Sequence, residues 1–225
     1  MPLEILYEDE WLVAVNKPAG LVVHPTYKNV SGTLLDALRA RHGGAPLFLL
    51  GRLDRLTSGL VIAAKSRETC AAMQRSWPDA EKDYLAVVAG NVDPVRGEID
   101  LALGTDPADR RRRVVRPDGA PSVTRFERLA YSEAAGMSLL RCRLVTGRRH
   151  QIRVHLQARG WPVVGDPVYG GLEPPAFSRQ ALHAWSVAVP HPVSGDRVRI
   201  IAPLPSDLRG FLEAMGLPLT SHLQL

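Results

Sequence analysis

The sequence predicts an α+β fold with a largely antiparallel sheet. Two apolar segments, 5–7 and 11–16, flank the short acidic turn EDE, a pattern typical of a β-hairpin. Residues 122–131 and 138–145 form another pair of strand-like segments with no helix between them. Because strands and helices do not alternate strictly along the chain, an antiparallel arrangement is favoured over a doubly wound parallel sheet.

The remaining elements follow from apolar content and capping signals. Residues 59–64 (GLVIAA) and 83–90 (DYLAVVAG) are predicted as strands that other parts of the chain cover on both faces. In 138–145, buried positions alternate with arginines, which indicates a half-buried strand. A late strand is expected at 198–203. Four helices are expected. The first covers 31–44 and is capped by Ser31 or Thr33. The second runs from its cap, Ser66, to about Trp77, and the others cover 149–159 and 207–215.

Composition indicates a polyanionic partner. The chain has 225 residues, a net charge of +5, and 24 arginines against four lysines. Arginine matches phosphate with a planar fork, so nucleic acid is the leading candidate, with an arginine-rich proteome as the alternative explanation. No apolar run approaches the ~20 residues that span a bilayer. The acidic start is unlike a signal peptide. The two cysteines, Cys70 and Cys142, are isolated within patterned elements, so we expect buried, reduced thiols in a cytoplasmic protein.

The stretch GRLDRLTSGL places one carboxylate, Asp54, between Arg52 and Arg55 and beside apolar segments on both sides. An aspartate at the mouth of an apolar strand can act as a nucleophile or general base if nearby cations hold it ionised. The residues Thr57 and Ser58 can turn the chain and donate hydrogen bonds. The alternative is a surface ion pair next to a turn.

The stretch TGRRHQIRVHL (146–156) predicts an anion-facing helix. Arg149 and Arg153 are four residues apart and are expected to share a helix face, which requires an anion opposite them, either phosphate or a buried carboxylate. His150 and His155 lie five apart, and neither a CxxC nor an HExxH motif is present. We therefore expect no metal site.

Residues 105–121 are predicted to be a loop with a run of four arginines. The run could clamp an RNA backbone irrespective of sequence, or could be a solvated loop. The arginines of the run are Arg110, Arg111, Arg112 and Arg113.

These motifs together resemble the RluA-type family of RNA pseudouridine synthases. The family signature His-Arg-Leu-Asp-x-x-Thr-Ser-Gly is matched by GRLDRLTSG, with Gly51 where the family usually has His. Four further stretches match in family order: LVAVNKPAGLVVHP, EKDYLAVVAG, TGRRHQIRVHLQARGWPVVGDPVYGG and LHAWSVAVPHPVSG…APLP. The matches run from about residue 4 to residue 205.

The resemblance implies site residues. Asp54 matches the catalytic aspartate, Tyr84 the tyrosine that stacks on the target base, and Arg153 the arginine that pairs with the aspartate. Arg52 matches the arginine that fills the gap left by the flipped nucleotide. With the arginines above, the expected RNA-binding set is Arg52, Arg55, Arg110, Arg111, Arg112, Arg113, Arg148 and Arg149.

The resemblance also implies an architecture and a reaction. The expected fold is a long, mostly antiparallel mixed sheet flanked by helices, with a central RNA-binding cleft, in one catalytic domain over residues 1–225 whose two lobes share the sheet. We expect no N-terminal RNA-binding module of the kind that many relatives carry. The expected activity is isomerisation of uridine to pseudouridine in ribosomal or transfer RNA, by a monomer, without a cofactor, a metal or a membrane.

Two other functions stay open at this point. One is an RNA-binding factor on the same fold that does not catalyse, although the residues Asp54, Tyr84 and Arg153 are all present. The other is an unrelated glycosidase, but glycosidases use two carboxylates at a set separation, and the key stretch holds one among arginines.

Overall fold

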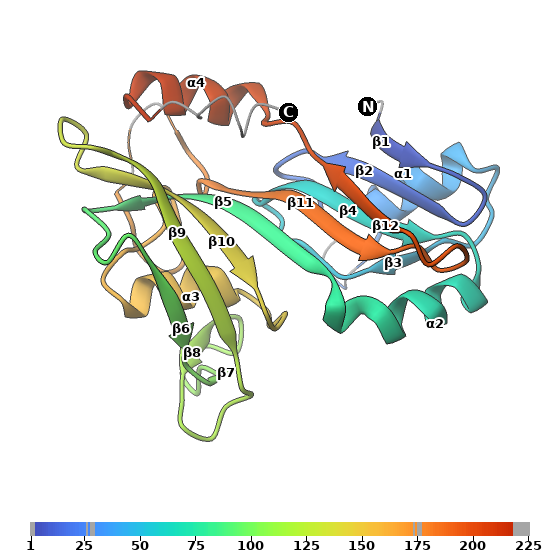
Figure 1. Cartoon of the computed structure of the whole chain (residues 1–225), viewed down its shortest axis with the longest axis horizontal. Helices are drawn as coiled ribbons and strands as arrows, with labels where there is room; N and C mark the ends of the chain where they lie inside the picture. Colours follow the sequence, from blue (N-terminus) through green and yellow to red (C-terminus); the bar gives the residue numbers. More distant parts are fainter. Residues whose placement is uncertain (1–2, 26, 28–29, 173, 175–176, 218–225) are drawn as a thin grey trace. The chain divides into compact units, whose positions relative to one another are not determined.

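A computed structural model of the chain describes residues 3–25, 27, 30–172, 174 and 177–217 (Figure 1). The chain forms two compact units. Unit 1 comprises residues 1–82 and 184–204, and unit 2 comprises residues 83–183 and 205–225. Among the described residues, no helix has the length and apolar content that crossing a membrane requires.

Unit 1 is built on a mostly antiparallel sheet. Its strands pair in the order β1-β2-β4-β11, and β3 and β12 pair with β4 and β11, respectively. The predicted hairpin of β1 and β2 is confirmed. The strands are β1 (Glu4–Glu8), β2 (Leu12–Lys17), β3 (Phe48–Leu50), β4 (Ser58–Ala64), β11 (Leu182–Pro190), whose first two residues belong to unit 2, and β12 (Arg197–Ile201).

Two helices cover opposite faces of this sheet, because side chains alternate across β2 and β4. Helix α1 (Leu34–Arg41) packs its leucines against Val13, Val15 and Val61. Helix α2 (Arg67–Ser76) packs Met73 on the other face, against a cluster that includes Leu12 and Ile62. A short 3-10 helix, Trp77–Asp79, follows α2.

Both helices begin at predicted caps. The Thr33 hydroxyl accepts the Asp36 backbone N–H, and the Asp36 carboxylate accepts the Thr33 N–H, which completes a capping box. Ser66 accepts the Thr69 N–H in the same manner. Of the two cap candidates for α1, the structure selects Thr33.

In unit 2 the strands follow the order β5-β10-β9-β6, in which β9 pairs antiparallel with both β10 and β6, and helix α3 packs on these strands (Figure 1). A separate pair, β7 with β8, stands beside it. The elements are β5 (Glu81–Ala89), β6 (Arg96–Asp100), β7 (Leu103–Thr105), β8 (Arg113–Val115), β9 (Val123–Ser132), β10 (Met137–Leu144), α3 (Gln151–Ala158) and α4 (Ser206–Ala214).

Two predictions of local structure need correction here. Residues 105–121 are not a continuous loop, because Arg113–Val115 pair with Leu103–Thr105. Helix α3 begins at Gln151 and not at Arg149, so Arg149 does not share a face of that helix with Arg153. The cause is His150, whose φ of 59° is left-handed and breaks the helix before it can extend backwards.

Candidate active site

Asp54 lies in unit 1, on the turn that connects β3 to β4. The Thr57 N–H donates to the Asp54 carbonyl at 3.1 Å, which closes the turn. Asp54 is half-buried, while every residue of β4 is buried. The turn therefore projects a carboxylate from the end of a rigid strand, where packing fixes its position.

A buried lysine fixes the other side of this turn. Lys17 has no exposed surface. Its Nζ donates to the carbonyls of Pro18, Leu21 and Arg55 at 2.9, 3.0 and 3.1 Å. The Gly20 N–H donates to the same Arg55 carbonyl at 2.8 Å. The segment KPAGL is thereby tied to the residue that follows Asp54, a role that the sequence motif alone did not indicate.

The glycines at the two ends of the signature, Gly51 and Gly59, both have backbone conformations that favour glycine. Gly59 has φ +113°, and a Cβ there would lie 2.2 Å from the Ala184 carbonyl oxygen. Gly51 has φ +92°, a conformation that side chains other than glycine rarely adopt, although a Cβ would meet only Trp77 at 3.7 Å. The replacement of the family's usual His by Gly51 therefore suits the local backbone.

Tyr84 lies in unit 2 on β5, half-buried against the core cluster around Ala86 and Ile152. Its neighbour Asp83 points to the other face of the strand and is buried. Asp83 accepts two hydrogen bonds from Arg143 of β10, both at 2.7 Å. This bidentate pair fixes β5 against β10 and so fixes where Tyr84 is presented.

Arg153 is held in unit 2 by a carboxylate that the sequence analysis did not identify. Its Nε and Nη2 donate to Asp166 at 2.7 Å each, and the two side chains are 4% and 0% exposed. Burial alone raises the pKa of Asp166. The hydrogen bonds and charge of Arg153, with the N–H groups of Val168 and Tyr169, outweigh burial and hold that pKa below its ordinary value. Of the two anions expected there, phosphate or a buried carboxylate, a carboxylate lies opposite Arg153: Asp166, within GDPVYGG.

The start of α3 is pinned by Gln151, which is buried. Its side-chain oxygen accepts from the Thr146 hydroxyl and the Arg148 N–H at 2.8 and 2.9 Å, and its amide donates to the Val123 carbonyl. This network holds the TGRRHQ segment to β9. It places Arg153 in the first turn of the helix.

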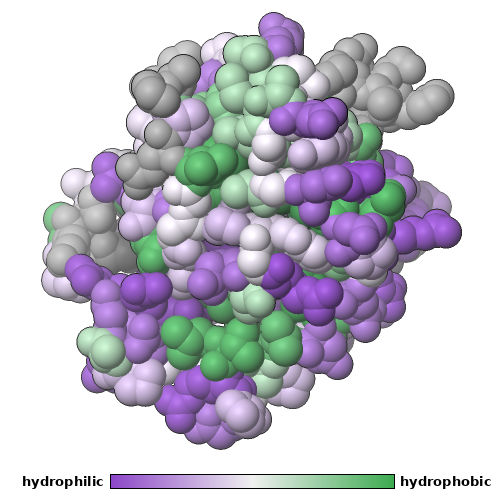
Figure 2. Space-filling view, turned by 90° about the vertical axis from the view of Figure 1, so that its left-hand side faces the viewer, coloured by the Kyte–Doolittle hydropathy of each residue, from purple (hydrophilic) through white to green (hydrophobic). Residues whose placement is uncertain are grey.

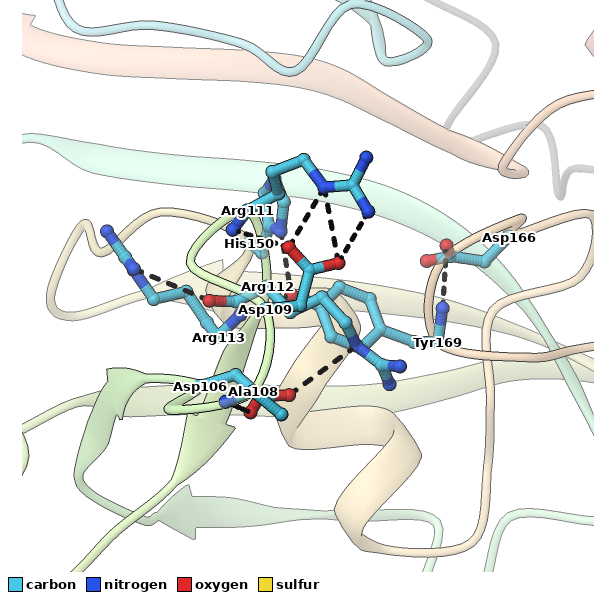
Figure 3. Close-up of polar contacts among 9 residues, drawn as sticks. All are labelled: Asp106, Ala108, Asp109, Arg111, Arg112, Arg113, His150, Asp166 and Tyr169. Atoms are coloured by element: carbon cyan, nitrogen blue, oxygen red, sulfur yellow. Dashed lines mark hydrogen bonds and ion pairs between the residues drawn. The ribbon is translucent and has the colours of Figure 1, made fainter.

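Three of the four arginines in the run 110–113 form hydrogen bonds or ion pairs within unit 2 (Figure 3). Arg111 donates to Asp109 in a bidentate pair, which lowers the pKa of Asp109 to about 2. Arg113 donates to the Thr105 hydroxyl. Arg112 lies 3.9 Å from an Asp106 carboxylate oxygen. Arg110 is exposed. Residues 106–113, here called the arginine loop, are therefore an ordered, cationic segment.

The other predicted RNA-binding arginines are exposed. Arg52 and Arg55 lie in unit 1, and Arg148 and Arg149 in unit 2. Burial lowers the pKa of His24, and the charges of Arg52 and Arg39 lower it further, which indicates a positive local potential. Figure 2 shows hydrophilic residues over much of one side of the molecule, with smaller hydrophobic areas between them.

The structure thus groups the predicted residues within each unit. Asp54, Arg52 and Arg55 stand together in unit 1, while Tyr84, Arg153 and the arginine loop belong to unit 2. The predicted pairing of Asp54 with Arg153 stays a prediction. Within the described part of the chain, no three His, Cys, Asp or Glu side chains are arranged to hold a metal ion.

Comparison with known proteins gives consistent results. Residues 11–158 match the family model described as RNA pseudouridylate synthase. The chain is 39% identical to "Ribosomal large subunit pseudouridine synthase D" of Xanthomonas campestris pv. campestris, over 96% of this chain and 70% of that protein. It is 41% identical to the protein of the same name in Nitrosomonas europaea, over 96% of this chain and 66% of that protein.

A solved structure, "Human RNA Pseudouridylate Synthase Domain Containing 1", matches with a TM-score of 0.75 and 28% identity, covering 91% of this chain and 84% of the human one. The predicted α+β pseudouridine synthase fold is confirmed by this match. The family model covers most of the chain, and the two curated relatives align along nearly all of it. The chain therefore belongs to the RNA pseudouridylate synthase family and is an RNA-modifying isomerase.

Proposed function

We propose that this protein converts specific uridines of ribosomal RNA to pseudouridine, with Asp54 as the group that acts on the substrate. The relatives in Xanthomonas and Nitrosomonas are named for the large ribosomal subunit, which supports ribosomal RNA ahead of transfer RNA. The observation that carries the proposal is the Asp54 turn. It presents one carboxylate between two arginines, from the end of a buried strand and against backbone anchored by Lys17.

The reaction needs little beyond such a group. The bond between N1 of uracil and C1′ of ribose breaks, the base rotates, and a bond between C5 and C1′ forms, while the proton on C5 is lost and N1 gains one. Atoms and electrons balance without a redox partner or water. Asp54 could attack C1′, attack C6, or remove the C2′ proton, and each route requires the ionised carboxylate.

Three other residues are assigned supporting roles. Tyr84 stacks on the extruded base, since it is a half-buried aromatic on a strand that the Asp83–Arg143 pair fixes. Arg153 stabilises the ionised Asp54, because a carboxylate removed from water needs a cation. Arg52, exposed and planar, occupies the stack vacated by the flipped uridine. Flipping is required because a stacked base is out of reach of the enzyme.

RNA affinity is proposed to rest on phosphate contacts from the arginine loop and from Arg148 and Arg149. Such contacts do not depend on base sequence, and they weaken steeply as salt rises. We further propose that the chain acts as a single catalytic domain, as a monomer and in the cytoplasm.

The deciding experiment replaces Asp54 with Asn, which preserves volume and removes the charge. Pseudouridine formation in ribosomal RNA should become undetectable, and RNA affinity should stay within about threefold because phosphate contacts carry it. Pseudouridine mapping of RNA incubated with each protein measures the first quantity, and filter binding measures the second. Glu10→Gln is the matched control, since Glu10 is an exposed carboxylate of unit 1.

Measurable turnover by Asp54→Asn, with wild-type contamination excluded, would remove Asp54 from the mechanism. A wild-type protein that binds RNA tightly and forms no pseudouridine in any ribosomal or transfer RNA would instead support the non-catalytic RNA-binding alternative.

A further inference from the structure

Tyr169 stands where the arginine loop meets the Arg153–Asp166 pair, and none of the roles assigned above uses it. The residue lies eleven positions after α3 ends and is 7% exposed. Its ring belongs to a small core cluster with Leu103 and Val154, which a phenylalanine would fill equally well. The hydroxyl group therefore needs a separate explanation.

The hydroxyl makes two short hydrogen bonds (Figure 3). It accepts the backbone N–H of Arg113 at 2.8 Å. It also shares a hydrogen bond with Nδ1 of His150 at 2.7 Å. Arg113 is the last residue of the arginine loop and the first of β8, and His150 is the residue from which α3 begins. One atom thus fastens the loop to the start of the helix that carries Arg153.

The ring and backbone of Tyr169 contact the same two regions. The guanidinium of Arg153 lies 4.9 Å from the ring centroid, and that of Arg112 lies 5.5 Å from it. The backbone N–H of Tyr169 donates to Asp166 at 3.2 Å. These are cation–π distances, so the ring attracts one arginine of the loop and the arginine of the buried pair.

The loop joins the rest of unit 2 through a short strand pairing and through Tyr169. Its β7–β8 pairing is three residues long on each side. Several of its side-chain bonds are internal, such as Arg111 to Asp109 and the Ala108 N–H to Asp106. Internal bonds give the loop a shape and do not attach it to the rest of the unit. The Arg113 N–H bond to Tyr169 supplies such an attachment.

We propose that Tyr169 is a positioning residue for RNA binding: its hydroxyl fixes the arginine loop in the place where the loop's arginines reach the RNA backbone. The proposal rests on the proposed function, because it assumes that the loop contacts phosphate. When the hydroxyl is lost, the loop keeps its charges but no longer presents them at one fixed position. Fewer arginines then contact phosphate simultaneously.

Tyr169→Phe tests this, because the change removes the hydroxyl, retains the ring and alters no charge. The slope of log affinity against log salt reports the number of phosphates neutralised. We expect its magnitude to fall by about 1–2 in Tyr169→Phe, and RNA affinity at ~0.15 M salt to fall about three- to tenfold. The single-turnover rate at saturating RNA should stay within about twofold, since Arg153 and its ring contact remain.

Two controls separate positioning from general destabilisation. Tyr7→Phe removes the bond of another phenol hydroxyl, to Asp9 in unit 1, and should leave the salt slope unchanged. Arg110→Ala should lower the slope by about 1 in the wild type and by less in Tyr169→Phe, since the two changes act on the same contacts. Amide exchange of residues 106–113 should accelerate in Tyr169→Phe and not in Tyr7→Phe.

The proposal is overturned if Tyr169→Phe binds RNA with the wild-type slope, whether or not its affinity changes, or if loop exchange is unaltered. Failure of the proposed function would look different. In that case the wild-type protein itself would show a shallow salt dependence or form no pseudouridine.

Discussion

The Arg153–Asp166 pair and the Arg111–Asp109 pair have nearly the same geometry in opposite surroundings. Both are bidentate, with N···O distances of 2.7 Å in the first and 2.8 to 2.9 Å in the second. The side chains of the first pair are 4% and 0% exposed, and those of the second are 83% and 30% exposed. Water competes for the hydrogen bonds of the exposed pair and not for those of the buried pair. The two pairs therefore contribute differently to the free energy of folding although their N···O distances are similar.

This difference separates two tasks. A buried pair cannot exchange its partner without leaving a charge in the core, so it suits a residue whose orientation must not vary. An exposed pair can exchange a carboxylate for a phosphate at little cost. The same Arg–Asp chemistry can therefore fix one arginine in unit 2 and leave another available to RNA.

The largest expected effect comes from Asp166→Asn, which removes the carboxylate charge that pairs with the buried Arg153. We expect the free energy of unfolding to fall by about 3–5 kcal/mol, which corresponds to a lower Tm by about 10 °C for a chain of this size. Urea denaturation at pH 7.5 and calorimetry measure both quantities. A loss below about 1 kcal/mol would show that burial adds little to this pair.

An intermediate effect is expected from His155, a buried group whose hydrogen-bond partners are uncharged. Its Nδ1 bonds the Thr124 hydroxyl and its Nε2 the Leu101 carbonyl, both at 2.9 Å. Burial lowers the pKa of His155 below 6.5, so the folded protein keeps it neutral while the unfolded chain binds a proton. Stability should therefore be full above about pH 6.5 and should fall as the pH drops from there towards the folded pKa.

Urea midpoints at pH 7.5, 6.5 and 5.5 measure this dependence. In His155→Gln the fall between pH 6.5 and 5.5 should be smaller than in the wild type, because the variant has no proton to bind at this position. His24 also has a lowered pKa and remains in both proteins, so only their difference reports on His155. Parallel pH curves would contradict the assignment.

The smallest effect on stability is expected for Asp109→Asn, which breaks the exposed pair with the same substitution used for Asp166. The Tm should remain unchanged within error, because water replaces the lost partner. RNA affinity should rise slightly at low salt, since a negative charge is removed beside Arg111. Thermal unfolding and filter binding check the two outcomes. A Tm loss similar to that of Asp166→Asn would end the distinction between the pairs.

The elements that could be predicted from sequence are those that local patterns determine. The caps at Thr33 and Ser66 mark the starts of α1 and α2, and the alternation in 138–145 marks β10. Cys142 is buried as expected, whereas Cys70 is only half-buried. The extent of α3 was predicted wrongly, because the left-handed φ of His150 has no signature in the residue type.

Only those site residues that lie within the sequence motifs could be predicted. The motifs point to Asp54, Tyr84 and Arg153, whose catalytic roles stay predictions, and they do not show that Asp166 is the partner of Arg153 in unit 2. That pairing joins residues thirteen positions apart through the fold. The hydroxyl contact between Tyr169 and Arg113 spans 56 positions and depends on how β8 and α3 pack. Such contacts are properties of tertiary structure, and no local pattern encodes them.

The burial of Lys17 has a consequence for chemical probing of the protein. The chain has only four lysines. Lys17 has no exposed surface. Lys82 is 9% exposed, and its ammonium group donates a hydrogen bond to the Trp77 carbonyl. Amine-directed crosslinkers and labels will therefore report little on the surface that meets RNA. Dicarbonyl reagents, which modify arginine, will map that surface instead. The arginines that contact RNA will be those whose modification decreases when RNA is bound.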